Sequence, residues 1–175
     1  RLYFALNQAR TASCFLPVQS AESLQLSGRG VLIGIVDSGI DLFHMDFRNK
    51  DGSSRILFLQ DQVLGRVFTK EEIDQALRLG SREIGEQMIP SSDPTGHGTA
   101  VAGIAAGNGR ESDGKYRGAA YESDLIVVRL GISDPNGFPR TTQVMKGLDF
   151  VVSKASELGR PIAVNLSFGN SYGSH

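Results

Sequence analysis

Three apolar runs constrain the fold of this chain more than any other feature. They are VLIGIV at 31–36, LIVVRL at 125–130 and IAVNLS at 162–167. Branched apolar runs without regular polar alternation are typical of strands that are buried on both faces, as in parallel sheets. We therefore expect three buried strands in one sheet.

Two helical patterns separate these strands. The segment 99–107 is an almost uniformly apolar run of small residues, which suits a buried helix. A second helix is expected from Thr141 or Thr142 to a stop at Gly159, with one apolar stripe along it. The order strand, helix, strand, helix, strand predicts right-handed crossovers, and hence an α/β fold with a parallel sheet covered by helices on both faces.

The remaining segments are less regular. Segment 47–94 is more polar and is predicted to be an insertion that contains a short strand at 55–59. Within it, Thr69 and Glu72 form a capping box for a helix that stops at Gly80. The first 27 residues, with Pro17, have no clear period and are predicted to be irregular. No repeat or linker is evident, so we expect one domain over 1–175 and no second domain.

Composition excludes several function classes. The 175 residues are 40% hydrophobic and 21% charged with a net charge of -1, which suits one globular domain and provides no overall field for nucleic acid or anionic lipid. No apolar run approaches the length of a membrane span. Because Cys14 is the only cysteine, no disulfide can form within the chain, and this leaves the compartment open.

Two titratable residues stand at element ends. Asp37 follows the first buried strand, at the sheet edge where open α/β folds place their active sites. His97 lies where a polar loop becomes a helix, and a helix N-terminus disfavours positive charge on an imidazole. Asp37 could hold the Nδ1–H of His97 so that Nε2 acts as a base. For one aspartate and one histidine alone, turn and helix capping without chemistry is the more frequent outcome.

The residues around Asp37 and His97 change this balance. Asp-Ser-Gly-Ile-Asp at 37–41, Gly-His-Gly-Thr at 96–99 and Asn-Leu-Ser-Phe-Gly at 165–169, in this order, resemble motifs of the subtilisin-like serine proteases, the subtilases of peptidase family S8. The end of the chain and the long insertion are similar to the Csp-type germination proteases of spore-formers. The resemblance implies a three-layer subtilisin-like fold, of which these residues form the N-terminal part of the catalytic domain.

The resemblance also implies a role for each matching residue. Asp37 would orient the histidine, and His97 would be the general base and acid of peptide bond hydrolysis. Ser167 and Gly169 would line the substrate cleft, with Gly137 on its other side. The substrate would be a peptide or protein, with no nucleic acid, membrane or organic cofactor, and the location would be extracellular or spore-associated in a bacterium.

The nucleophile is the largest departure from the family pattern. The family's Gly-Thr-Ser segment and its oxyanion asparagine have no match in these residues, and Ser38, Ser171 and Ser174 are unsuitable substitutes. We therefore expect this chain alone to be inactive unless the C-terminal remainder of the domain is supplied as a second chain. The alternative is a catalytically inactive pseudoprotease that binds peptides or regulates. The intact Asp37 and His97 favour an active parent.

Two further patterns suggest ligands. Segment 109–116 matches a phosphate-binding loop except at Tyr116, but it precedes a strand and is predicted to be a solvated loop. His44 and Asp46, with Asp41, could be taken for a metal cluster, although such residues are usually turn and capping groups. Asp46 also matches a residue that binds calcium in many subtilases, so a structural calcium would need the loop at 107–118 to supply the other ligands.

Overall fold

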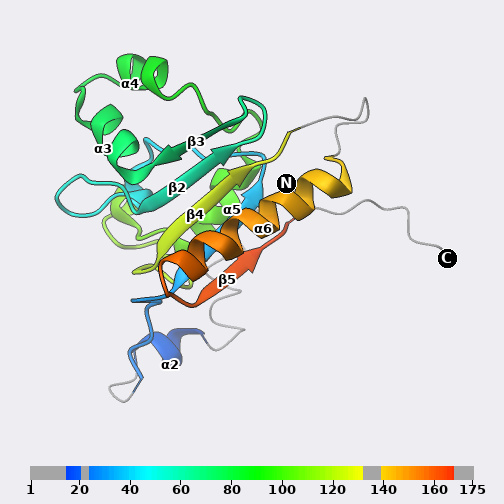
Figure 1. Ribbon diagram of the computed structural model, residues 1–175. Coiled ribbons are helices and arrows are strands. Elements are labelled where there is room, and N and C mark those ends of the chain that lie inside the picture. The colour runs from blue at the N-terminus through cyan, green and yellow to red at the C-terminus, as the bar shows by residue number, and fades with distance from the viewer. Residues whose placement is uncertain (1–14, 21–23, 132–138, 168–175) are drawn as a thin grey trace.

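A five-stranded sheet organises the structure (Figure 1). The computed structural model describes residues 15–20, 24–131 and 139–167. The strands lie in the order β3-β2-β4-β1-β5. Their bounds are Leu32–Asp37 for β1, Ile56–Asp61 for β2, Arg66–Thr69 for β3, Asp124–Arg129 for β4 and Ile162–Asn165 for β5. All neighbouring strands are parallel except the β2–β3 pair, which confirms the mainly parallel sheet.

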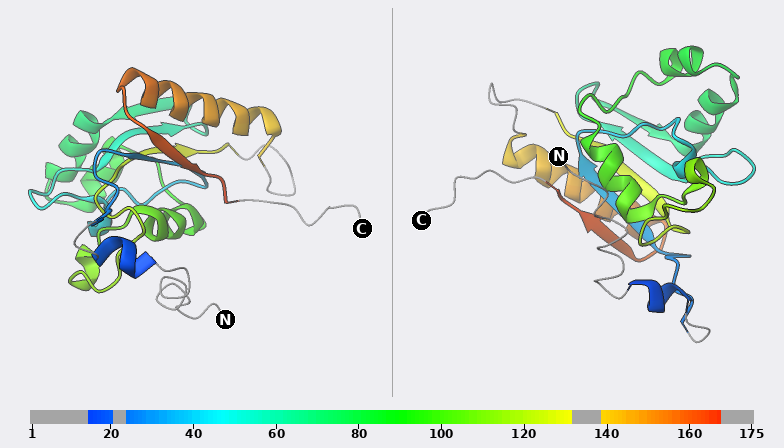
Figure 2. Two further views of the ribbon diagram at one scale, coloured as in Figure 1. Left: turned by 90° about the horizontal axis from the view of Figure 1, so that it is seen from below. Right: turned by 180° about the vertical axis from the view of Figure 1, so that it is seen from behind.

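The two predicted crossover helices lie on opposite faces of this sheet (Figure 2). They are α5 (His97–Ala106) and α6 (Thr141–Glu157). Alternate residues of β1 serve the two faces: Ile33 and Ile35 pack in the core that contains α5, whereas Leu32 and Val36 pack in the core that contains α6. A strand with apolar residues on both faces is thereby buried along its whole length.

The third predicted strand is less buried than expected. β5 ends at Asn165. All of its residues are half-buried or exposed, and Leu166 after the strand is exposed. The physical reason is position: β5 is an edge strand that pairs with β1 alone among the described residues. The prediction of a strand was right, but the prediction that it is buried on both faces was wrong for this part of the chain.

Segment 47–94 contributes to the sheet and adds two helices. β2 pairs with β4, and β3 extends the sheet from β2. The helices are α3 (Lys70–Arg78) and α4 (Arg82–Met88). The predicted capping box is present, since Glu72 Oε2 accepts the Thr69 N–H at 2.9 Å. That the segment is an insertion stays a prediction.

Three short elements complete the described structure. Helix α2 (Phe15–Ser20) contains Pro17, so the prediction of irregular structure there was wrong. Proline is tolerated in the first turn of a helix because the missing N–H has no partner within the helix. The other two are 3₁₀ helices, η1 (Met45–Phe47) and η2 (Arg110–Ser112), and Phe47 of η1 is part of the core. Across the described ranges, no helix combines the length and the apolarity that a membrane crossing would need.

Candidate active site

Asp37 is the last residue of β1 and is 4% exposed. Its Oδ1 accepts the Ser38 backbone N–H at 2.7 Å and lies 2.8 Å from His97 Nδ1. An ionised carboxylate only accepts hydrogen bonds, so the proton of this contact belongs to Nδ1. Its Oδ2 is buried and has no hydrogen-bond partner in the part of the chain that the structure describes.

His97 is the first residue of α5, and its side chain is 53% exposed. With the proton on Nδ1, the Nε2 atom of a neutral imidazole carries a lone pair. The structure thus pairs a buried carboxylate, Asp37, with a half-exposed imidazole, His97. The structure brings together the two residues that the sequence singled out.

Two glycines allow α5 to approach the end of β1 so closely. A Cβ atom on Gly98 would lie 2.2 Å from the Gly39 carbonyl oxygen and 3.2 Å from Asp37 Cβ. Gly39 itself has a φ of +134°, and its own Cβ would meet the Ser92 carbonyl oxygen at 2.4 Å. Steric overlap at Gly98, and both steric overlap and a φ that L side chains rarely adopt at Gly39, make glycine at both positions a condition for the contact between Asp37 and His97.

A second carboxylate, Asp93, lies behind this pair, and sequence reasoning missed it. Asp93 Oδ1 accepts the Ser38 hydroxyl at 2.7 Å, and Asp93 Oδ2 accepts the backbone N–H and the hydroxyl of Thr99 at 2.8 and 2.7 Å. Burial raises the pKa of Asp93, but these hydrogen bonds outweigh burial and leave the pKa below its usual value. The available signal was an aspartate just before a helix whose N-cap, Gly96, has no capping side chain.

The other predicted cleft residues are only partly described. Ser167 follows β5, and its hydroxyl donates to Asn165 Oδ1. Gly137 and Gly169 lie outside the described residues, as do Ser171 and Ser174. Ser38 is described, and its hydroxyl is engaged by Asp93 rather than free to act as a nucleophile.

Asp46, the predicted calcium ligand, is hydrogen-bonded within the chain, and a structural calcium there stays a prediction. Asp46 Oδ1 accepts the Glu111 N–H at 2.9 Å, and the Arg55 guanidinium donates to the Asp46 carbonyl at 2.9 Å. No group of three His, Cys, Asp or Glu side chains suited to a metal occurs in the described residues. His44 Nδ1 accepts the Asp46 N–H, and Asp41 Oδ1 accepts the Phe43 N–H, so both act as turn and capping groups.

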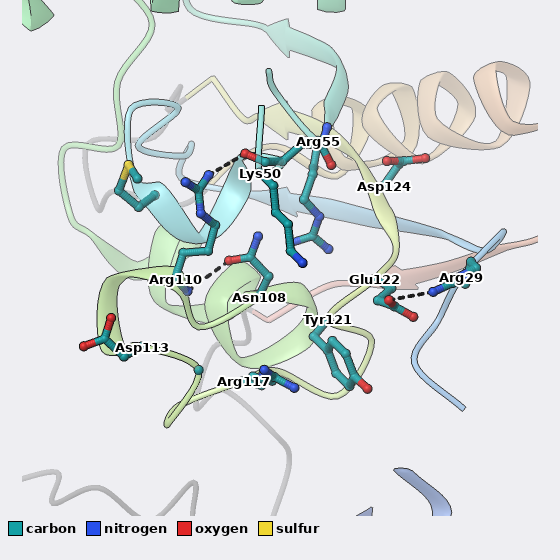
Figure 3. A pocket seen from close by; sticks show the side chains of 13 residues that line it. Arg29, Lys50, Arg55, Asn108, Arg110, Asp113, Arg117, Tyr121, Glu122 and Asp124 are labelled. Atoms are coloured by element: carbon teal, nitrogen blue, oxygen red, sulfur yellow. Dashed lines mark hydrogen bonds and ion pairs between the residues drawn. The ribbon is translucent and has the colours of Figure 1, made fainter. Parts of the chain in front are cut away.

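A large polar cavity lies at the other ends of the strands from Asp37 and His97 (Figure 3). Its volume is about 740 Å³, and it borders Asp124, the first residue of β4, and Arg55, just before β2. Two of its carboxylates are engaged, since Glu122 pairs with Arg29 and Asp124 pairs with Arg160. It thus lies at the amino ends of the strands, away from Asp37 and His97. The basic residues of its lining are Arg29, Lys50, Arg55, Arg110 and Arg117.

Segment 109–116 borders this cavity and is a largely exposed loop, as predicted. It contains the short 3₁₀ helix η2 and precedes strand β4 instead of following a strand. Ser112 Oγ accepts the Tyr116 N–H at 3.0 Å, so the loop is closed by its own residues. A phosphate-binding loop lies between a strand and the helix that follows it, so this arrangement does not match one.

Comparison with known proteins agrees with this geometry. Residues 28–175 match the model of the subtilase family, Peptidase_S8. The chain is 27% identical over 161 residues to the minor extracellular protease Vpr of Bacillus subtilis, covering 90% of this chain and 16% of Vpr. It is 30% identical over 148 residues to subtilisin-like protease 5 of Arthroderma otae, covering 83% of this chain and 28% of that protein.

Solved structures agree as well. The CspB protease of Clostridium perfringens has a TM-score of 0.85 and 34% identity, with 95% of this chain and 34% of that chain covered. A psychrophilic protease, S41, shares the fold with a TM-score of 0.58 and 23% identity, covering 91% of this chain and 44% of that one. The chain therefore spans less than half the length of these relatives. It belongs to the subtilase family of subtilisin-like serine proteases and is similar in fold and sequence to a Csp-type protease.

Proposed function

We propose that this chain supplies the aspartate and the histidine of an Asp-His-Ser triad in a serine endopeptidase. The observation that carries the proposal is the 2.8 Å contact between His97 Nδ1 and Asp37 Oδ1 at the carboxyl end of a buried parallel strand. The order of Asp37 before His97 agrees with the order of triad residues in subtilisin-like enzymes. The serine would come from the part of the domain that follows these residues.

The proposed reaction is peptide hydrolysis through an acyl-enzyme. The serine Oγ would attack the carbonyl carbon while its proton passes to His97 Nε2, and the same proton would then leave on the amide nitrogen. Water would repeat the sequence on the acyl-enzyme and restore the serine. Asp37 would stabilise the imidazolium that forms in each step, with no organic cofactor.

The substrate would be a peptide or protein in extended form. Its backbone would pair near Ser167 and Gly169, with Gly137 on the opposite side of the cleft. The half-exposed end of β5 supports this placement, because an edge strand offers backbone groups to a further strand. A location outside the cell or on a spore is the corresponding proposal, and the name of Vpr describes that relative as extracellular.

A fluorophosphonate probe tests the proposal on the full-length protein. We expect covalent labelling of the serine, and we expect His97→Ala to lower the labelling rate by on the order of 10⁴-fold or more because triad residues act as a unit. An Asp113→Asn variant, changed at the far side of the sheet, is the matched control and should label like the wild type. Labelling that is equal in wild type and His97→Ala would contradict the proposed triad.

The rival function is a pseudoprotease that binds peptides or regulates without catalysis. The two are separated by the residue at the Gly-Thr-Ser position of the parent protein. Alanine or glycine there, together with no labelling of the wild type, would favour the pseudoprotease.

A further inference from the structure

We propose that Asp93 is a positioning residue for the catalytic pair, acting through the Ser38 hydroxyl. This inference rests on the proposed protease function. In it, Asp93 fixes the direction of the single Ser38 hydroxyl hydrogen, so that Asp37 Oδ1 is left to bind His97. Asp93 also anchors the first turn of α5, which carries His97.

The Ser38 hydroxyl has four polar neighbours, and their chemistry decides from which of them it accepts a hydrogen bond and to which it can donate one. Its oxygen lies 2.7 Å from Asp93 Oδ1, 3.1 Å from Asp37 Oδ1, 3.0 Å from the Gly98 N and 2.9 Å from Thr95 Oγ1. The Gly98 N–H can only donate. The Thr95 hydroxyl accepts the His97 N–H at 3.2 Å, and its own hydrogen has two acceptors, Ser38 Oγ at 2.9 Å and Asp93 Oδ1 at 3.3 Å, of which Ser38 is the nearer. Ser38 therefore accepts from Gly98 and Thr95 and has one hydrogen for two carboxylates.

The shorter contact decides where that hydrogen goes. Asp93 Oδ1 is 0.4 Å closer to the hydroxyl than Asp37 Oδ1 is, from the 2.7 and 3.1 Å contacts. Asp37 Oδ1 already accepts the Ser38 N–H and contacts His97 Nδ1. A third donor on this oxygen would compete with the imidazole for its lone pairs. By taking the Ser38 hydrogen, Asp93 removes that competitor.

The other oxygen of Asp93 fixes the helix. Thr99 presents two donors to Asp93 Oδ2, because its hydroxyl accepts the Asp41 N–H at 2.9 Å and must give its own hydrogen to Asp93. The first three N–H groups of α5, from His97, Gly98 and Thr99, are thus bound by Thr95, Ser38 and Asp93. The N-cap residue, Gly96, has no side chain that could accept hydrogen bonds from these N–H groups, so other residues accept them. Asp93 binds the N–H of Thr99 directly and that of Gly98 through the Ser38 hydroxyl.

The isosteric variant Asp93→Asn tests this arrangement in the full-length protein. The asparagine carbonyl must face the two donors of Thr99, so its NH₂ group faces Ser38. The Ser38 hydroxyl cannot donate to this NH₂ group, so it turns its hydrogen towards Asp37 Oδ1. We expect kcat on a peptide substrate to fall about 10- to 100-fold with KM changed less than about twofold, since only the catalytic pair is misplaced.

A double variant separates positioning from simple helix capping. Adding Ser38→Ala to Asp93→Asn removes the competing hydroxyl, so kcat of the double variant should be equal to or above that of Asp93→Asn. If the two losses instead multiply, Asp93 and Ser38 act independently and the proposal is overturned. An unchanged kcat in Asp93→Asn also overturns it. Asp113→Asn is the matched control and should keep the wild-type kcat.

Two further measurements keep the test decisive. If Asp93→Asn does not fold, Ser38→Ala and Ser38→Thr replace it: Ala removes the hydrogen that competes with His97 for Asp37 Oδ1, and Thr keeps a hydroxyl that Asp93 binds, so both should retain kcat within about threefold. A loss of about tenfold or more in Ser38→Ala contradicts the proposal, because it would show that the hydroxyl itself is required. Fluorophosphonate labelling of the wild type is measured alongside. Labelled wild type with any of these contradicting results rejects the role of Asp93 alone, and unlabelled wild type rejects the protease function.

Discussion

At the scale of single residues, two buried ionisable side chains at opposite ends of the strands have different hydrogen-bond partners. Asp37 is held by backbone and imidazole N–H groups, whereas the Arg55 guanidinium is surrounded by carbonyl oxygens. Arg55 donates to Ser123, Asp46 and Ala106, and no carboxylate lies within ion-pair distance of it in the described residues. Burial lowers the pKa of Arg55 to about 10, so it stays charged at neutral pH.

Removal of Arg55 should therefore destabilise the protein strongly. Arg55→Ala leaves buried carbonyls without donors, including the Ala106 carbonyl at the end of α5, and we expect a loss of about 2–4 kcal/mol in the free energy of unfolding. Arg29→Ala is the matched control, because its side chain is 81% exposed and exposed ion pairs such as the one with Glu122 contribute little to stability. Urea unfolding of the full-length protein measures both. Equal losses in the two variants would show that the Arg55 hydrogen bonds contribute no more to the free energy of unfolding than the exposed Arg29 ion pair does.

At the scale of elements, the site depends on how closely α5 approaches the end of β1. The approach needs glycine at Gly98 because the facing atom is a backbone carbonyl, which cannot move aside as a flexible side chain would. Neither β1 nor α5 alone contains this information, since Asp37 and His97 are 60 residues apart. The helix and the strand together form the site.

Gly98→Ala tests this approach directly. The new methyl group would lie 2.2 Å from the Gly39 carbonyl, so α5 must shift away from Asp37. We expect a fall of about 100-fold in kcat/KM, because a displacement of about 1 Å is enough for such a loss, and a destabilisation of about 1–3 kcal/mol from overpacking. Peptide hydrolysis and urea unfolding measure the two effects. Wild-type kcat/KM in this variant would mean that the contact tolerates the extra carbon.

At the scale of the whole molecule, the described structure leaves one side of the sheet incomplete. β5 is an edge strand, and Ile104 of α5 is 51% exposed while Leu166 after β5 is 42% exposed. The chain covers 34% of the CspB chain that it resembles, so the rest of such a domain could cover these apolar groups. An unpaired strand edge and exposed large apolar side chains both favour association.

We therefore expect isolated residues 1–175 to bind a hydrophobic dye such as ANS and to associate in solution. Co-expression with the remainder of the domain should reduce dye fluorescence by about tenfold, because the exposed side of β5 and α5 becomes buried. Dye fluorescence and light scattering measure this. A monomeric 1–175 chain that melts cooperatively and binds no dye would contradict the prediction.

The sequence by itself determined the local structure and the identity of the central pair. Apolar runs predicted β1 and β4, small residues predicted α5, and the Thr69 capping box marked the start of α3, because each of these signals lies within a few consecutive residues. Asp37 and His97 could be selected because motifs surround them. Pro17 in α2 and the half-exposed β5 could not be predicted, because a short helix and an edge position depend on packing rather than on local pattern.

Only the tertiary structure decided how the pair is held. Asp93 reaches Ser38 across 55 residues of sequence, and Ser38 in turn reaches Gly98 across 60. Hydrogen bonds of this kind form only after the sheet has placed the end of β1 against the first turn of α5. The sequence therefore determined which carboxylate and which imidazole meet. The fold decided which second carboxylate stands behind them, since a hydroxyl hydrogen goes to the acceptor that packing brings nearest.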